Sequence, residues 1–133
     1  MKDILADIHQ YSHNLTISQV VSFFERRGIT ITRSMIQNYV RDGLLPPPLN
    51  KRHYTHKHLA VLALTATLKT VYEMPEIRTA LAPLTDKEGI PIEKYKELLN
   101  KVEGLSISAE TDALTIMAYS AGLKSEAIRR LKK

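Results

Sequence analysis

Two short helical segments follow one another closely near the start of the chain, and this spacing restricts the fold. Residues 16–19 read Thr-Ile-Ser-Gln, the pattern of a capping box, so a helix is predicted to begin after Thr16 and to end at Gly28. A second helix is predicted from the cap Thr32 to about Asp42, with its apolar residues at helical spacing. Two short helices joined by so tight a turn are typical of a helix-turn-helix.

Prolines and glycines divide the rest of the chain into further helices. The prolines at 46–48 exclude a helix, because they lack N–H donors, and residues 49–54 are predicted to form a small loop or β-ribbon. Thr55 is predicted to cap a long, deeply buried helix that runs to about Tyr72 and includes Val71. Pro75 fits the first turn of a short helix that ends near Leu81.

The last third of the chain is also predicted to be helical. Pro91 opens a helix with one apolar stripe, and Gly104 ends it. Ser108 is predicted to cap an apolar helix that stops near Gly122, and Ser125 to start a last, basic one. The predicted fold class is therefore all-α, that is mainly helical, with at most one small hairpin.

The positive charge is concentrated in one stretch. The chain carries a net charge of +5, and residues 17–58 hold seven bases against two acids, whereas the remainder is balanced. A basic segment on a neutral body suits a polyanion such as nucleic acid. The alternative is a basic face that merely interacts with solvent.

Composition and motifs give no sign of an enzyme. Without cysteine there is no thiol nucleophile or thiolate metal site, and neither a glycine-rich phosphate loop nor a His-Glu-x-x-His motif occurs. We therefore expect no catalysis, cofactor or metal, although a catalytic site assembled from distant residues stays open. No apolar run reaches the roughly 20 residues of a membrane span, and the first residues do not resemble a signal peptide, so a cytoplasmic location is expected.

The second short helix carries side chains that can read DNA. Gln and Asn can pair with adenine, and Arg with guanine or phosphate, while the free N–H groups after Thr32 offer a seat for phosphate. Lys51 and Arg52 on the following loop can grip the backbone, and Arg26 and Arg27 end the first helix, which normally crosses the phosphates. The residues expected to contact DNA are Arg27, Thr32, Arg33, Ser34, Gln37, Asn38, Tyr39, Arg41, Lys51, Arg52, His53 and Tyr54.

Residues 16–81 resemble the DNA-binding domain of the MerR family of transcription regulators. The similarity rests on a run of features in order. Residues 17–27 look like the family's first helix and residues 32–42 like its recognition helix. Three motifs accompany them: residues 39–46 (Tyr-Val-Arg-Asp-Gly-Leu-Leu-Pro), residues 52–55 (Arg-His-Tyr-Thr) and residues 74–81 (Met-Pro-Glu-Ile-Arg-Thr-Ala-Leu). The overall organisation is also similar to small bacterial proteins catalogued only as a domain of unknown function. The chain departs from the MerR pattern at Gln37 and Asn38, where the family most often has arginine and an aromatic residue, and at Asn50 and Lys51 in a short wing.

The resemblance implies a winged helix-turn-helix domain over residues 1–83, with its core at 16–81, followed by a helical dimerisation or effector module over 84–133. It further implies a homodimer that binds a two-fold symmetric site in double-stranded DNA and regulates transcription, with RNA polymerase as a further candidate partner.

A protein–protein adaptor that kept the winged-helix scaffold is the alternative, because a fold does not fix a function. The apolar residues 113–121 would then form its partner surface. Tyr39 and Tyr54 likewise have a second interpretation, as core aromatic residues with a hydrogen-bonded hydroxyl.

Overall fold

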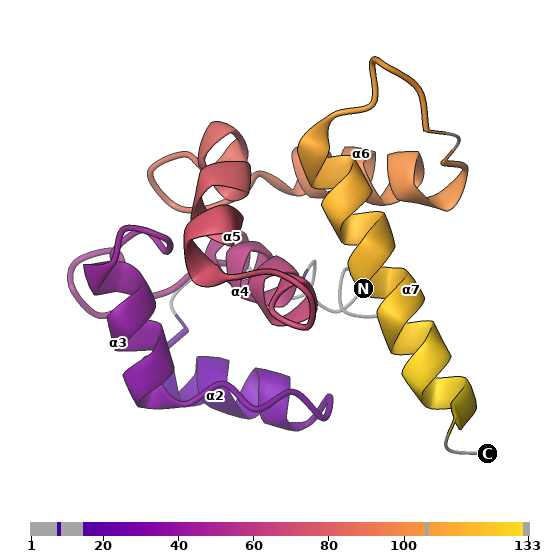
Figure 1. The fold of residues 1–133 in the computed structure, drawn as a ribbon. Coiled ribbons are helices and arrows are strands. Elements are labelled where there is room, and N and C mark those ends of the chain that lie inside the picture. Colours follow the sequence, from indigo (N-terminus) through magenta and orange to yellow (C-terminus); the bar gives the residue numbers. More distant parts are fainter. Residues whose placement is uncertain (1–7, 9–14, 106, 132–133) are drawn as a thin grey trace.

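Six α-helices and one short 3-10 helix build the part of the chain that the computed structural model describes, namely Ile8, residues 15–105 and residues 107–131. The β pairing reported in these residues consists of isolated bridges, so the prediction of a mainly helical, all-α fold is confirmed. Figure 1 shows α2 and α3 at one end, α4 and α5 in the middle, and α6 and α7 at the other end. The elements are α2 (Ile17–Glu25), α3 (Arg33–Arg41), α4 (His56–Leu68), α5 (Met74–Leu81), η1 (Ala82–Leu84), α6 (Ile92–Glu103) and α7 (Ala113–Leu131).

Threonine caps start the first three of these helices. Thr16 Oγ1 accepts a hydrogen bond from the Gln19 N–H at 3.2 Å, and the Gln19 side chain accepts one from the Thr16 N–H at 2.8 Å. Thr32 Oγ1 accepts a hydrogen bond from the Met35 N–H at 3.1 Å. The predicted starts at Thr16, Thr32 and Thr55 are therefore confirmed, because each side chain satisfies an N–H group that the helix leaves without a partner.

α4 lies at the centre of the molecule (Figure 1), and most of its residues are buried. The residues from His58 to Thr65 are at most 1% exposed, and Leu68 is fully buried. The helix packs against α5, α6 and α7, so one hydrophobic cluster joins both ends of the molecule. The predicted deep burial of this helix is confirmed.

The end of α4 comes earlier than the apolar pattern predicts. The helix stops at Leu68 and does not reach Tyr72, and the Leu68 carbonyl accepts hydrogen bonds from the N–H groups of Val71 at 3.0 Å and Tyr72 at 2.9 Å. Thr70 Oγ1 donates to the Thr67 carbonyl at 2.9 Å, and such local side-chain bonds compete with helix continuation. Val71, predicted to lie in the buried helix, is instead 43% exposed.

α7 is one long helix where two shorter ones are predicted. Ser108 forms hydrogen bonds within a turn and does not cap the helix; the Thr115 N–H donates instead to Asp112 Oδ1 at 2.9 Å. The helix continues through Gly122, so Ser125 lies inside it and starts no helix of its own. One glycine costs a helix only about 1 kcal/mol, which the helix-forming alanine, leucine, lysine and glutamate residues around it offset.

The loop before α6 is fastened to the first turn of α4. Asp86 Oδ2 accepts a hydrogen bond from Lys57 Nζ at 2.7 Å, and Asp86 Oδ1 accepts from the N–H groups of Glu88 at 2.8 Å and Gly89 at 3.2 Å. The Ile90 N–H donates to the Lys57 carbonyl at 3.2 Å. The hydrogen bond from the Lys57 ammonium lowers the pKa of Asp86, so the carboxylate that holds this loop stays ionised at neutral pH.

Tyr95 on α6 is fully buried, and its hydroxyl has no hydrogen-bond partner in the described part of the chain. Burial raises the pKa of this hydroxyl well above its usual range. Because an unpaired buried hydroxyl costs about 1–3 kcal/mol, Tyr95→Phe is expected to raise the free energy of unfolding by about 1 kcal/mol, measured by urea denaturation. The half-buried Tyr72→Phe is the control and should change it by less than about 0.5 kcal/mol. A clear loss of stability in Tyr95→Phe would contradict this expectation.

Candidate nucleic-acid interface

One face of α3 is exposed and polar, and the opposite face is buried. The five polar residues fall into two series four residues apart, which places them on one side of the helix. The exposed residues are Arg33, Ser34, Gln37, Asn38 and Arg41. Ile36 and Tyr39 are buried on the other side, so core packing orients the polar face toward solvent.

The two arginines of this face make only solvent-exposed contacts with the protein itself. Arg33 Nη2 donates to Ser18 Oγ on α2 at 2.7 Å, and Arg41 Nε lies 3.6 Å from Asp42 Oδ1. The side chains of Arg41 and Asp42 are 71% and 54% exposed, and a pair so open to water contributes little. Both guanidinium groups can therefore exchange these contacts for a phosphate or a base.

Arg27, at the end of α2, differs from the other predicted contact residues. Its Nη1 donates to the Phe23 carbonyl at 2.7 Å, and its guanidinium carbon lies 3.8 Å from the centre of the Phe23 ring. The side chain is half-buried and closes the C-terminal end of its own helix. The neighbouring Arg26 is exposed and is the better placed of the two for a phosphate.

A tight turn between α3 and α4 exposes two of the predicted bases, Lys51 and Arg52. Residues 49 and 53 form an antiparallel bridge, and the Arg52 N–H donates to the Leu49 carbonyl at 3.0 Å. Asn50 and Lys51 have φ angles of 52° and 64°, the sign that both central residues of a type I′ turn require. His53, on the far side of the bridge, is half-buried.

Tyr39 and Tyr54 belong to the core and not to the exposed face. Tyr39 is 7% exposed, and its hydroxyl accepts a hydrogen bond from Lys69 Nζ at 3.2 Å. Tyr54 is 5% exposed, and its ring meets the His58 ring edge-on at 5.2 Å. Burial raises the pKa of Tyr54, and the charge of Arg33 opposes that shift.

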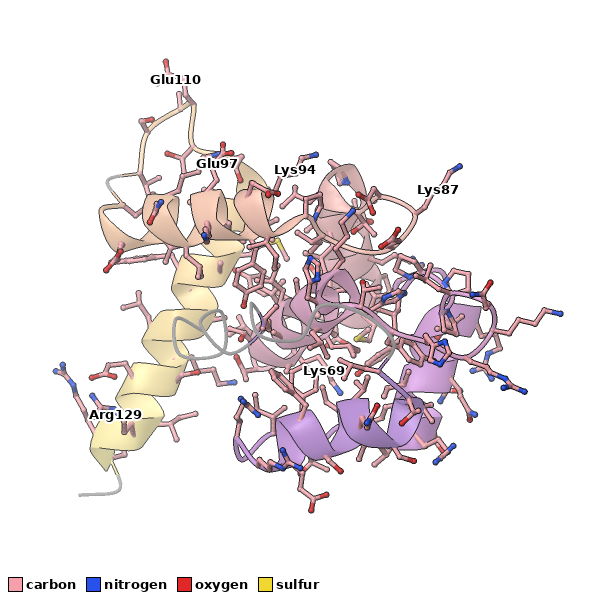
Figure 2. All side chains as sticks on the ribbon, turned by 180° about the vertical axis from the view of Figure 1, so that it is seen from behind. Lys69, Lys87, Lys94, Glu97, Glu110 and Arg129 are labelled. Carbon is pink, nitrogen blue, oxygen red and sulfur yellow. The ribbon has the colours of Figure 1, made fainter. Side chains whose placement is uncertain are left out.

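Two side chains that the sequence does not single out hold α3 and its exit loop. Lys69, at the end of α4, reaches Tyr39, and Figure 2 shows it between α4 and α2. Arg78 on α5 donates to the Asp42 carbonyl at the end of α3 at 3.2 Å. Both contacts join residues 30 or more positions apart, so no local spacing signals them.

The described residues contain neither a candidate metal site nor a candidate membrane-spanning helix. No group of three His, Cys, Asp or Glu side chains among them could hold a metal ion. None of their helices combines the length and the apolar character that crossing a bilayer requires.

Comparison with known proteins identifies the family of this chain but finds no match among curated proteins or solved structures. A family model matches residues 5–102, which is most of the chain, and the match does not connect the protein with the MerR regulators. The chain belongs to the family described as Domain of unknown function (DUF1836).

Proposed function

We propose that the protein is a transcription regulator that binds a specific site in double-stranded DNA as a dimer. The observation that carries this proposal is the exposed polar face of α3, where two arginines flank Gln37 and Asn38. Arginine is the usual partner of guanine and phosphate, and glutamine or asparagine that of adenine. A helix of nine residues fits into the major groove, so this face supports α3 as the recognition helix.

The surroundings of α3 supply further phosphate contacts. Lys51 and Arg52 are exposed on the turn that would correspond to the wing of MerR regulators. Arg26 is exposed at the end of α2. α2, α3 and the loop after α3 lie at the same end of the molecule (Figure 1). Positive groups at one end of the molecule suit the regular phosphates of a duplex.

Dimerisation is supported by the far end of the molecule. The last turns of α7 expose Leu123 (54%) and Leu131 (83%), which lie eight residues apart on one side of the helix, and Ile128 (41%). Exposed apolar side chains repeated along a helix are typical of a helix–helix interface. A symmetric pair of chains would place two α3 helices on the two halves of one DNA site.

Selection of bound sequences from a random pool of DNA duplexes tests the proposal directly. The affinity of the protein for the selected site is then measured. Affinity should fall by about a thousandfold or more between about 50 and 200 mM salt, because a dimer would neutralise about eight phosphates. Replacing Arg33 and Arg41 together by alanine should weaken binding by about tenfold to a hundredfold at fixed salt, while circular dichroism stays unchanged.

The control replaces Lys87 and Lys96, which are exposed on other elements, and removes the same charge. It should keep nearly the full affinity. Equal losses in the two double variants, or an affinity that does not depend on salt, would contradict the role of α3. No selected sequence at all would favour an adaptor built on the same scaffold.

A further inference from the structure

A groove of about 840 Å³ lies between α5, η1, α6 and the start of α7. No residue of α2 or α3 lines it. Cavities of about 300–1,000 Å³ are typical of sites for small organic ligands. The groove is therefore a separate candidate site, and it is large enough for such a ligand.

The walls of the groove suit an apolar ligand body. α5 and η1 contribute Ala80, Pro83 and Leu84, α6 contributes Leu98, and α7 contributes Met117. These side chains come from four helical elements that pack against the core, so the walls are preformed. An aromatic or branched apolar group could therefore transfer from water into the groove without displacing the wall side chains.

The rim carries an ammonium group between two carboxylates. Lys101 Nζ lies 3.7 Å from Glu97 Oε1 and 3.5 Å from Asp112 Oδ2. Both distances exceed the roughly 2.7–2.9 Å of a strong charge-assisted hydrogen bond, and all three side chains are at least half exposed. Lys101 is thus loosely held and can turn outward. Figure 2 shows Glu97 and Lys94 rising from the same side of α6.

The charge of the lining favours a cation. Three acids line the groove, namely Glu76, Glu97 and Asp112, against two bases, Lys94 and Lys101. The lining is therefore negative by one charge, although the whole chain is positive by five. Lys94 lies three residues before Glu97, about 5 Å away along the helix, so it partly offsets that carboxylate, and the net negative charge of the lining comes from three acids against two bases.

We propose that this groove binds a small organic ammonium compound. The apolar body lies against Leu98 and Met117, and the ammonium group takes the place of the Lys101 ammonium between Glu97 and Asp112. In the free protein the Lys101 ammonium occupies the position of the ligand ammonium, so Lys101 competes with the ligand for the two carboxylates. The proposal does not depend on DNA binding, and it is tested without DNA.

Three matched probes test the charge preference: 4-phenylbutylamine, 4-phenylbutyrate and 4-phenylbutanol. Each is titrated into the full-length, isotope-labelled protein, and amide chemical shifts report the affinity and the place of binding. The amine is expected to bind about fivefold more tightly than the alcohol, and the acid more weakly than both, as for an ion pair at a half-exposed site. The largest shifts are expected at residues 97–101 and 112–117.

Variants separate the groove from the rest of the surface. Glu97→Gln should lower the affinity for the amine about fivefold, whereas Glu93→Gln, which removes the same charge from α6 outside the groove, should leave it unchanged. Lys101→Met should raise the affinity for the amine, because it removes the competing ammonium. Thr79→Trp fills the groove from the exposed side of α5 and should abolish binding of all three probes.

Several results would overturn the proposal. They are equal affinities for amine and acid, an unchanged or lower amine affinity in Lys101→Met, shifts outside the groove, or binding that survives Thr79→Trp. No saturable binding of the amine up to about 10 mM would also overturn it, since that affinity is below what even a small preformed site provides.

Discussion

Gly89→Ala is expected to lower the free energy of unfolding by about 2–5 kcal/mol, the largest loss expected for a methyl group added at any of the five glycines. A Cβ atom at Gly89 would lie 2.2 Å from the carbonyl oxygen of Lys57 and 2.4 Å from its carbonyl carbon. Those are backbone atoms in the first turn of the buried α4, so they cannot move aside as a flexible side chain would. The φ angle of 138° adds strain, because residues with a Cβ rarely adopt it.

The effect would spread because the same loop is held at several points. Moving Gly89 away from Lys57 would stretch the hydrogen bond from the Ile90 N–H to the Lys57 carbonyl and the ion pair of Lys57 with Asp86. Native proteins are stable by only about 5–15 kcal/mol, so a loss of this size should be visible as a large shift of the urea midpoint.

Two other glycines are matched controls for the added methyl group. Gly43 also has a positive φ, 80°, but its Cβ would meet no atom within 4 Å, so Gly43→Ala should cost only about 1 kcal/mol. Gly122 lies in α7 with open space around it, and Gly122→Ala should gain about 0.5–1 kcal/mol. If Gly89→Ala were no worse than Gly43→Ala, the close approach to α4 would be absent in solution.

Local signals predicted most of the helices because their causes are local. The side chain of Thr16 or Thr32 caps its own helix from one position before it, and Pro91 stands where α6 begins. The break predicted at Gly122 failed because a glycine weakens a helix without ending it, and α7 also gains from packing on α4 and α6.

In the candidate DNA interface, the sequence predicted correctly only those exposed side chains whose exposure follows from their spacing along a helix. The exposed face of α3 follows from the positions of Ile36 and Tyr39 on the opposite side, whereas the burial of Tyr54 depends on pairing with Leu15, far away in the sequence. Arg27 is predicted to contact phosphates because it ends the first helix, whereas its guanidinium packs on Phe23, four residues earlier. The groove between α5, α6 and α7 has no counterpart in any local motif, because it exists only once three helices are placed.

Acid is expected to weaken the fold through His58, a fully buried residue in the first turn of α4. The backbone N–H of Thr55 donates to His58 Nδ1 at 2.9 Å, so this nitrogen carries no proton. The other ring nitrogen, Nε2, therefore carries the proton and donates to the Pro47 carbonyl at 3.1 Å. One neutral ring thus caps α4 and ties the proline segment to it.

The direction of the pH effect follows from the pKa of His58. Burial lowers this pKa below 6.5, while the Pro47 carbonyl and the carboxylates of Glu88 and Asp86 oppose the shift. The contribution to stability is therefore complete above pH 6.5, where the unfolded chain is also neutral. Below pH 6.5 the unfolded chain binds a proton that the folded chain does not, so stability falls by at most about 1.4 kcal/mol per pH unit until the folded pKa is reached.

Two replacements of His58 distinguish its role in capping α4 from the effect of its protonation on stability. His58→Ala should lower the free energy of unfolding by about 2–4 kcal/mol at pH 7.5, because it leaves a cavity and removes the partners of the Thr55 N–H and the Pro47 carbonyl. His58→Gln keeps an acceptor at the third position of the helix, as in a capping box, so it should lose less. Both should remove this part of the pH dependence between pH 7.5 and 5.5.

His53→Gln is the control, because it removes a half-buried histidine from the turn at residues 49–53 and leaves the cap of α4 in place, so the loss of stability expected for His58→Ala at pH 7.5 should be absent. A wild-type stability that stays level from pH 7.5 to 5.5 would mean that His58 is protonated as easily in the folded as in the unfolded chain. Its Nδ1 would then carry a proton directed at the Thr55 N–H, and the cap of α4 would have to be made in another way. A level wild-type profile combined with a large loss in His58→Ala would restrict the role of the ring to packing.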